Sequence, residues 1–120
     1  MSTYVDGFVI PIPKSKIADY KRLAQKAGKL WKDCGALDYH ECVGDDLEVK
    51  GFTPFGKFVK TKPGETVVFS WVTFKSRKHR DQVNARLMKD PRMTKLGEDS
   101  ESIFDCKRMA YGGFKSVVHL

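Results

Sequence analysis

The segment from Thr66 to Phe74, TVVFSWVTF, restricts the choice of folds more than any other part of this sequence. It is rich in β-branched and aromatic residues, which is typical of a strand, and the turn pair Pro63-Gly64 precedes it. Side chains alternate between the two faces of a strand. Because apolar residues occupy both alternating sets here, we predict a central strand that is covered on both faces.

The remaining elements follow from hydrophobic periodicity and from the residues that cap helices or break strands. The first predicted helix carries apolar residues at spacings of three and four, with Ser15 as its N-cap and Gly35 as its end. Ser76 is predicted to cap the second helix, and Pro91 to prevent its smooth continuation. We predict strands at 4–12, 37–43, 66–74 and 109–118, and helices at 17–34 and 76–90.

The resulting order βαββαβ is that of a ferredoxin-like α+β domain with an antiparallel sheet. A chain of 120 residues is expected to form one such domain, covering residues 1–120. Strands 4–12 and 66–74 are predicted to be central, whereas 37–43 carries the acids and histidine of an edge strand. Gly112-Gly113 marks either a bulge or a close backbone approach in the last strand.

Two helices can cover only one face of such a sheet, yet both faces of its central strands are apolar. An uncovered apolar face is unusual in a monomer, so we predict a homodimer in which a second copy packs there with two-fold symmetry. The competing interpretation is that a terminal segment or the loop at 44–65 folds over this face. That loop carries several aromatic residues, which either seal the domain or dimer edge or form a lid over a small-molecule cleft.

The net charge of +7 raises the question of a polyanionic partner. A basic stripe follows one face of helix 17–34, but no aromatic residues are interleaved with it for base stacking, so we interpret it as a solvated face. Lys50-Gly-Phe52 begins like an RNA-recognition motif, but it precedes the strand in which that motif would lie. We therefore do not expect nucleic acid as a partner, and RNA binding ranks below the other functions considered.

Cysteine usage and hydropathy predict a cytoplasmic protein without a membrane span. Three cysteines are an odd number, and they lack a CxxC spacing, so we interpret them as reduced thiols. The histidines at 40, 79 and 119 lie in separate elements, and no nucleotide-binding or zinc-protease motif occurs. Neither a metal nor a cofactor is predicted.

Five segments together resemble the YbaA-like family of small uncharacterised bacterial proteins. They are YVDGFVIPIP from Tyr4, GALDYHECVGDD from Gly35, FSWVTFKSR from Phe69, NARLMKDPRM from Asn84 and FDCKRMAYGGF from Phe104. The resemblance implies a dimeric α/β barrel, an architecture that is shared by small-molecule monooxygenases, isomerases, haem-handling enzymes and ligand-sensing domains. It implies no catalytic residues, and a shared fold does not specify function.

The alternation of side chains between the two faces of a strand indicates a candidate cleft. Asp6 shares a face of its strand with Tyr4 and Phe8, and a carboxylate among aromatic residues has the raised pKa that suits proton transfer. Trp71 and Tyr111 are further candidates for the lining of this cleft. His40 and Glu41 are also candidates, although alternation directs them to opposite faces. The structural alternatives are an ion pair or backbone contact for Asp6 and a solvated edge position for His40.

A candidate anion site lies at the start of the second helix. Positive charge there opposes the helix dipole, so a bound phosphate or carboxylate would relieve the conflict. Its candidate ligands are Ser76, Arg77 and Arg80, and the alternative is a solvated basic cluster.

These features favour a homodimer that binds a small molecule, with an oxygenase-like or isomerase-like enzyme as one interpretation. The alternative is a non-catalytic ligand-sensing or interaction module. The sequence does not decide between an enzyme and a binding protein, and it does not identify the ligand.

Overall fold

A computed structural model describes residues 3–120 of the chain, and it confirms the predicted ferredoxin-like α+β architecture. Within these residues one sheet has the strand order β2-β3-β1-β4, and every neighbouring pair is antiparallel. The central positions of β1 and β3 and the edge position of β2 are as predicted. The strands are β1 (Tyr4–Pro13), β2 (Asp38–Val43), β3 (Glu65–Phe74) and β4 (Ala110–Lys115).

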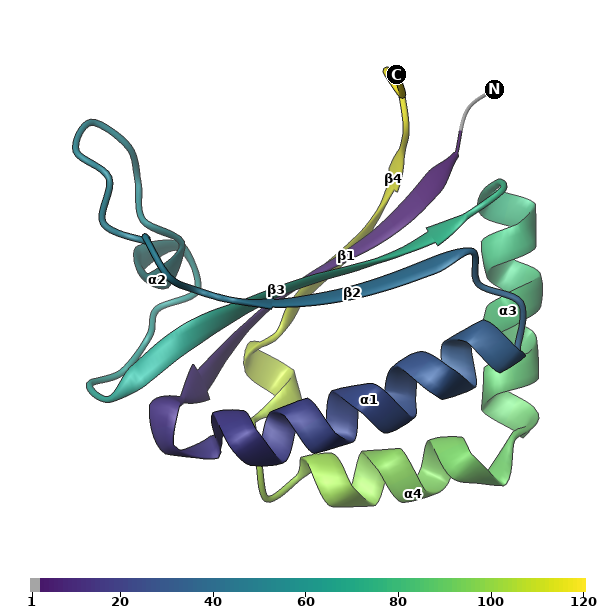
Figure 1. Cartoon of the computed structure of the whole chain (residues 1–120), viewed down its shortest axis with the longest axis horizontal. Coiled ribbons are helices and arrows are strands. Elements are labelled where there is room, and N and C mark those ends of the chain that lie inside the picture. Colours follow the sequence, from purple (N-terminus) through teal and green to yellow (C-terminus); the bar gives the residue numbers. More distant parts are fainter. Residues whose placement is uncertain (1–2) are drawn as a thin grey trace.

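The long helices lie on one side of the sheet, which leaves the other side open (Figure 1). Helices α1 and α4 run side by side beneath the strands, and α3 stands at one end of the layer (Figure 1). They are α1 (Ile17–Asp33), α3 (Arg77–Lys89) and α4 (Pro91–Ser100), accompanied by the short α2 (Phe55–Phe58) and the 3₁₀ turns η1 (Lys14–Lys16) and η2 (Cys106–Arg108).

One of the two predicted N-caps is correct. The Ser76 hydroxyl accepts a hydrogen bond of 3.1 Å from the backbone N–H of His79, as expected of the residue that begins α3. Ser15 does not cap α1, because it lies inside η1 and the N-cap position falls on Lys16. The 3₁₀ turn continues directly into the helix, so the first turn of α1 forms without a side-chain cap.

Helix α4 was not predicted from the sequence. Asp90 is extended and ends α3, but its carboxylate then accepts a hydrogen bond of 2.9 Å from the backbone N–H of Arg92. Pro91 occupies the first turn of the new helix, where a missing N–H has no cost. The Asp90-Pro91 pair therefore begins a helix as well as ending one.

The last strand, β4, is shorter than the predicted 109–118. Of the two alternatives for its Gly pair, a bulge or a close backbone approach, the structure shows the close approach. The pairing of β4 with β1 is continuous through Gly112 and Gly113, so no bulge forms. A Cβ atom on Gly113 would overlap the hydroxyl of Tyr4, which lies across it. Gly113 thus allows the Tyr4 ring to lie against the sheet.

The hydrophobic core lies between the sheet and the helices. Val68, Val72 and Phe74 project from β3 toward the helices and are fully buried. Leu30 of α1 and Val83 of α3 pack against this layer and are equally inaccessible. The alternating set of β3 residues that includes Val72 therefore forms the sheet side of the core.

The open face of the sheet keeps apolar side chains exposed. Phe69 of β3 is 43% exposed and Phe114 of β4 is 63% exposed. The segment before β3 covers this face only in part, because Phe55 of α2 stacks on Phe69 with ring centroids 5.9 Å apart. The predicted sealing role of the 44–65 loop is thus seen at one end of the face, while Phe114 remains uncovered.

Candidate functional site

A cleft of about 220 Å³ opens between the sheet and helices α1 and α4, and we call it the inner cleft. Its walls are almost entirely apolar, and most of its lining comes from the two helices that lie beneath the sheet. A small apolar cleft with few polar groups is the usual form of a small-molecule site. The principal apolar lining residues are Phe8, Leu23, Trp31, Val72, Met93 and Leu96.

The inner cleft contains one carboxylate, Glu41, and two tyrosine hydroxyls bind it. Tyr20 of α1 donates its hydroxyl to Glu41 Oε1 at 2.7 Å. Tyr39, two residues before Glu41 on β2, donates its hydroxyl to Glu41 Oε2 at 2.5 Å. Each carboxylate oxygen therefore receives one charge-assisted hydrogen bond, which compensates for the partial burial of the acid.

The register of the edge strand places this trio on the helix side of the sheet. Glu41 is opposite Ser70 of β3 and Tyr39 is opposite Val72, and both β3 residues face the helices. Helix α1 approaches closely enough for Tyr20 to reach Glu41 because Gly28 lies against the Tyr39 ring. A Cβ atom at Gly28 would lie 2.8 Å from Cδ1 of that ring.

Burial extends the pH range over which both tyrosines stay in the protonated, donating form. It raises the pKa of Tyr20 and of Tyr39 far above the ordinary value, and the negative charge of Glu41 raises both further. At neutral pH the trio therefore consists of a half-buried acid that is hydrogen-bonded by two neutral phenols.

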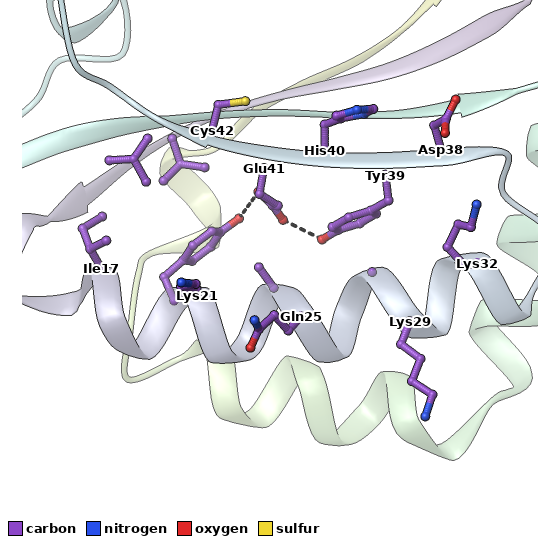
Figure 2. Close-up of a pocket in the computed structure, with 15 residues that line it drawn as sticks. Ile17, Lys21, Gln25, Lys29, Lys32, Asp38, Tyr39, His40, Glu41 and Cys42 are labelled. Carbon is purple, nitrogen blue, oxygen red and sulfur yellow. Dashed lines mark hydrogen bonds between the residues drawn. The ribbon is translucent and has the colours of Figure 1, made fainter.

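A second hollow, the outer groove, lies on the solvent side of the same trio. It has a volume of about 700 Å³ and runs between α1 and the edge strand β2 (Figure 2). Tyr20, Tyr39 and Glu41 line both the outer groove and the inner cleft. The Tyr20–Glu41 hydrogen bond joins α1 to β2, and the Tyr39–Glu41 hydrogen bond lies within β2 (Figure 2). Because all three residues line both hollows, the trio lies between them.

The structure places Asp6 outside the inner cleft, in an ion pair. Asp6 is 2% exposed, and Arg80 of α3 donates to its Oδ1 from a distance of 2.7 Å. The same Arg80 nitrogen donates to the hydroxyl of Tyr111 at 2.8 Å. Burial raises the pKa of Asp6, as predicted, and Arg80 offsets part of that effect. Asp6 and Tyr111 are thus neighbours, but a cation binds both.

Trp71 does not share a cleft with Asp6, and this part of the prediction is wrong. In the sheet Trp71 pairs with Gly7, whereas Asp6 pairs with Val72, so Trp71 projects from the open face. His40 projects there too and stacks on Trp71, with ring centroids 4.5 Å apart. His40 and Glu41 point to opposite faces, as alternation predicted.

The predicted anion site also lacks its central ligand. Arg80 is turned into the sheet toward Asp6 and Tyr111, so its guanidinium is not free to bind an anion at the start of α3. Ser76 already accepts from a backbone N–H, and Arg77 remains exposed. The basic cluster is therefore better described as one structural arginine beside solvated neighbours.

Sequence reasoning found Glu41 but missed the two tyrosines that hold it. Tyr20 lies at the three- and four-residue spacing of the first predicted helix, and that spacing shows only that it faces the core. Tyr39 has the same strand parity as Glu41, which was an available signal. The convergence of their hydroxyls on one carboxylate depends on how α1 crosses β2.

All three cysteines are free thiols, and only one of them is buried. Cys34 lies in the core, whereas Cys42 and Cys106 are exposed. Across residues 3–120 no helix has the length and apolar character needed to span a bilayer. The same residues contain no cluster of three or more His, Cys, Asp or Glu side chains suited to a metal ion.

Solved structures of low sequence identity share this fold. SnoaB, described as a cofactor-independent oxygenase from Streptomyces nogalater, aligns with a TM-score of 0.59 at 11% identity, over 99% of this chain and 95% of its own. A protein from an uncultured marine organism, described as a dimeric ferredoxin-like protein, aligns with a TM-score of 0.56 at 11% identity over the whole of both chains. The fold defines the class as ferredoxin-like α+β.

The family follows from closer similarity. The model of the family described as "Protein of unknown function (DUF1428)" matches residues 3–106. The uncharacterized protein YbaA of Escherichia coli K12 is 44% identical over 115 residues, covering 96% of this chain and 97% of the relative. The chain therefore belongs to the DUF1428 family, and the YbaA-like resemblance of its segments is confirmed.

Proposed function

We propose that this chain is a homodimeric small-molecule-binding protein whose ligand occupies the inner cleft beside Glu41. The observation that carries the proposal is a single carboxylate, bound by two phenol hydroxyls, at the edge of a mainly apolar cleft. Apolar walls supply affinity through burial, and a few fixed polar groups set the orientation of the ligand.

The chemistry that this arrangement supports best is proton abstraction by Glu41. Each oxygen of the carboxylate accepts one hydrogen bond from a tyrosine and keeps a further lone pair for a ligand proton. The two hydroxyls hold the carboxylate in place, which favours a general base. In an isomerase-like reaction the proton would return to another carbon of the same molecule. In an oxygenase-like reaction dioxygen would be the second reactant, and the fold shared with a cofactor-independent oxygenase supports this option.

Hydrogen exchange at an enolisable ketone tests the proton-abstraction step. The probe is 2-tetralone, a fused bicyclic ketone, incubated in D₂O with the protein while NMR follows the loss of its C1 protons. We expect exchange above the buffer rate, and a loss of about 10²-fold or more of the protein-dependent rate in Glu41→Gln. Glu98→Gln, an exposed change of the same kind on α4, is the control and should exchange like wild type.

A non-catalytic ligand-sensing module is the second candidate. The trio itself favours it, because a carboxylate that already accepts from two tyrosines can also serve as a fixed hydrogen-bond acceptor. If wild type exchanges 2-tetralone no faster than buffer but native mass spectrometry of the purified protein shows a copurifying small molecule, the sensing function is favoured and the enzyme is rejected.

The homodimer part of the proposal rests on the open face. Phe69, Trp71 and Phe114 project from this face, and α2 covers only one end of it. Two copies packed face to face would remove these side chains from water. Phe114→Lys should shift the mass measured by light scattering from dimer to monomer, and the fold should remain because Phe114 is 63% exposed. A monomeric wild type at micromolar concentration would refute the pairing.

A further inference from the structure

We infer that Ser70 and Glu41 form a two-point site for one hydroxyl group, and that the ligand of the inner cleft is a small planar apolar molecule bearing that hydroxyl. This inference rests on the proposed function, because it names the ligand class of the same cleft. It adds Ser70, a residue whose side-chain contacts do not explain a role in the fold.

Ser70 is buried and lines the inner cleft. The residue is 4% exposed, and its hydroxyl makes no hydrogen bond with any group in residues 3–120. In that same part of the chain, no fully enclosed side-chain nitrogen or oxygen lacks a partner. The Ser70 hydroxyl must therefore open onto the cleft, where a water or a polar group of a bound ligand can be its partner. A largely buried residue with a free donor that faces a cleft is suited to bind a polar group of a ligand at this point.

The sheet places this hydroxyl beside the carboxylate. Ser70 and Glu41 are direct Cα partners on β3 and β2, on the face that lies against the helices. Side chains that are directly opposite in antiparallel strands have Cβ atoms about 5 Å apart. On the other neighbouring strand Ser70 pairs with Phe8, which is apolar and also lines the cleft. The polar pair Ser70–Glu41 therefore has the apolar ring of Phe8 as its neighbour on the other side.

The donor and acceptor inventory of the pair suits a hydroxyl. The carboxylate of Glu41 can only accept a hydrogen bond from the ligand, because it has no proton to donate. Its negative charge also repels an anion or a carbonyl oxygen. Ser70 can donate. One hydroxyl oxygen satisfies both groups, since it donates its proton to Glu41 and accepts from Ser70. The remaining walls offer mainly apolar contact, so the rest of the ligand is apolar, as in a phenol or an enol fused to a ring.

A pair of shape-matched probes tests the hydroxyl requirement. 2-Naphthol and 2-methylnaphthalene differ by a hydroxyl in place of a methyl group on the same bicyclic frame. Each is titrated into ¹⁵N-labelled protein, and the indole N–H of Trp31, which lines the cleft, reports binding. We expect wild type to bind 2-naphthol more tightly than 2-methylnaphthalene. Ser70→Ala should bind 2-naphthol about fivefold more weakly while its affinity for 2-methylnaphthalene stays unchanged.

Ser100→Ala is the matched control within the same cleft. Ser100 also lines the inner cleft and is 7% exposed, but its hydroxyl already donates to the carbonyl of Gly97 at 2.8 Å. Its removal should leave the ratio of the two affinities as in wild type.

Each remaining outcome counts against a defined statement. Equal losses for both probes in Ser70→Ala, or an unchanged 2-naphthol affinity, would overturn the role of Ser70 and leave the cleft as a binding site. If neither probe shifts Trp31 in wild type, both the inference and the proposed binding function fail. If Glu41→Gln loses 2-tetralone exchange while Ser70→Ala leaves the 2-naphthol affinity unchanged, the hydroxyl site is overturned. Proton abstraction by Glu41 is then supported without it.

Discussion

Asp6 and Glu41 are two carboxylates on the same face of one sheet, and their surroundings differ in charge. Asp6 lies at one end of the sheet against the Arg80 guanidinium, with its charge compensated by a cation. Glu41 lies on the edge strand against two neutral hydroxyls and the inner cleft. A carboxylate that pairs with an arginine stabilises the fold through that ion pair. A carboxylate that is hydrogen-bonded only by phenols keeps its negative charge available to a ligand. Burial alone therefore does not show which carboxylate is free of a cation.

The largest expected effect comes from breaking the Asp6 pair. Arg80→Met would leave the Asp6 carboxylate buried without its cation, and we expect the free energy of unfolding to fall by about 3–5 kcal/mol. Urea denaturation measures it. Arg77→Met, at an exposed position on the same helix, should change that free energy by less than about 0.5 kcal/mol. Equal losses in the two variants would show that the ion pair does not hold α3 to the sheet.

The close packing of α1 against β2 near Glu41 can be tested by substituting two glycines. Gly28→Ala would force α1 away from the Tyr39 ring, so we expect a loss of about 1–3 kcal/mol and a longer Tyr39–Glu41 contact. Gly97→Ala on α4 meets no atom within 4 Å and should stabilise by about 0.5–1 kcal/mol through helix propensity. Thermal denaturation compares the two. If Gly28→Ala is also stabilising, the close packing of α1 on β2 is refuted.

Alkaline pH should distinguish the phenol-held carboxylate from the arginine-held one. Because folding raises the pKa of Tyr20 and Tyr39, their contribution to stability is complete below pH 10 and is lost as the pH rises above it. Tyr39→Phe should cost about 1–2 kcal/mol at neutral pH and make the fall above pH 10 less steep. Urea midpoints across this pH range provide the measurement. A parallel fall in wild type and variant would contradict the assignment.

The smallest expected effect concerns a third carboxylate, Glu65, which like Asp6 pairs with an arginine. Arg108 donates to both oxygens of Glu65 at 2.7 Å and lowers its pKa to about 2, whereas burial raises that of Asp6. The stability that Glu65 supplies is present above its ordinary pKa of 4.5 and is lost as the pH falls toward 2. We expect it to be small, because Arg108 is partly exposed and solvent screens the pair.

Glu65→Gln should therefore flatten the acid limb of the stability curve. We expect the difference between the urea midpoints at pH 6 and pH 3 to be smaller in this variant than in wild type. Glu98→Gln is the matched control, and it should reproduce the wild-type difference. An acid limb of unchanged slope in Glu65→Gln would show that the Arg108 pair contributes nothing measurable.

The fold was more predictable than the site. The strand at 66–74 and the cap at Ser76 depend on local sequence, and the structure confirms both. Helix α4 was missed because the Asp90-Pro91 pair stops one helix and starts another, and a stop signal alone does not reveal whether a second helix begins beyond it. For the candidate site, alternation correctly separated His40 from Glu41 but could not relate Trp71 to Asp6, since that requires the register between strands.

Taken alone, the sequence determined the order of the four strands and two of the helices, the central strands and the apolar character of both sheet faces. Periodicity, caps and turns act over a few residues, so their free energies can be judged from neighbouring side chains. Only the tertiary structure decided which acid is neutralised. Arg80 reaches Asp6 across 74 positions, and Tyr20 reaches Glu41 across 21. Such pairings depend on strand register and on the path of a helix over the sheet, which no local pattern encodes.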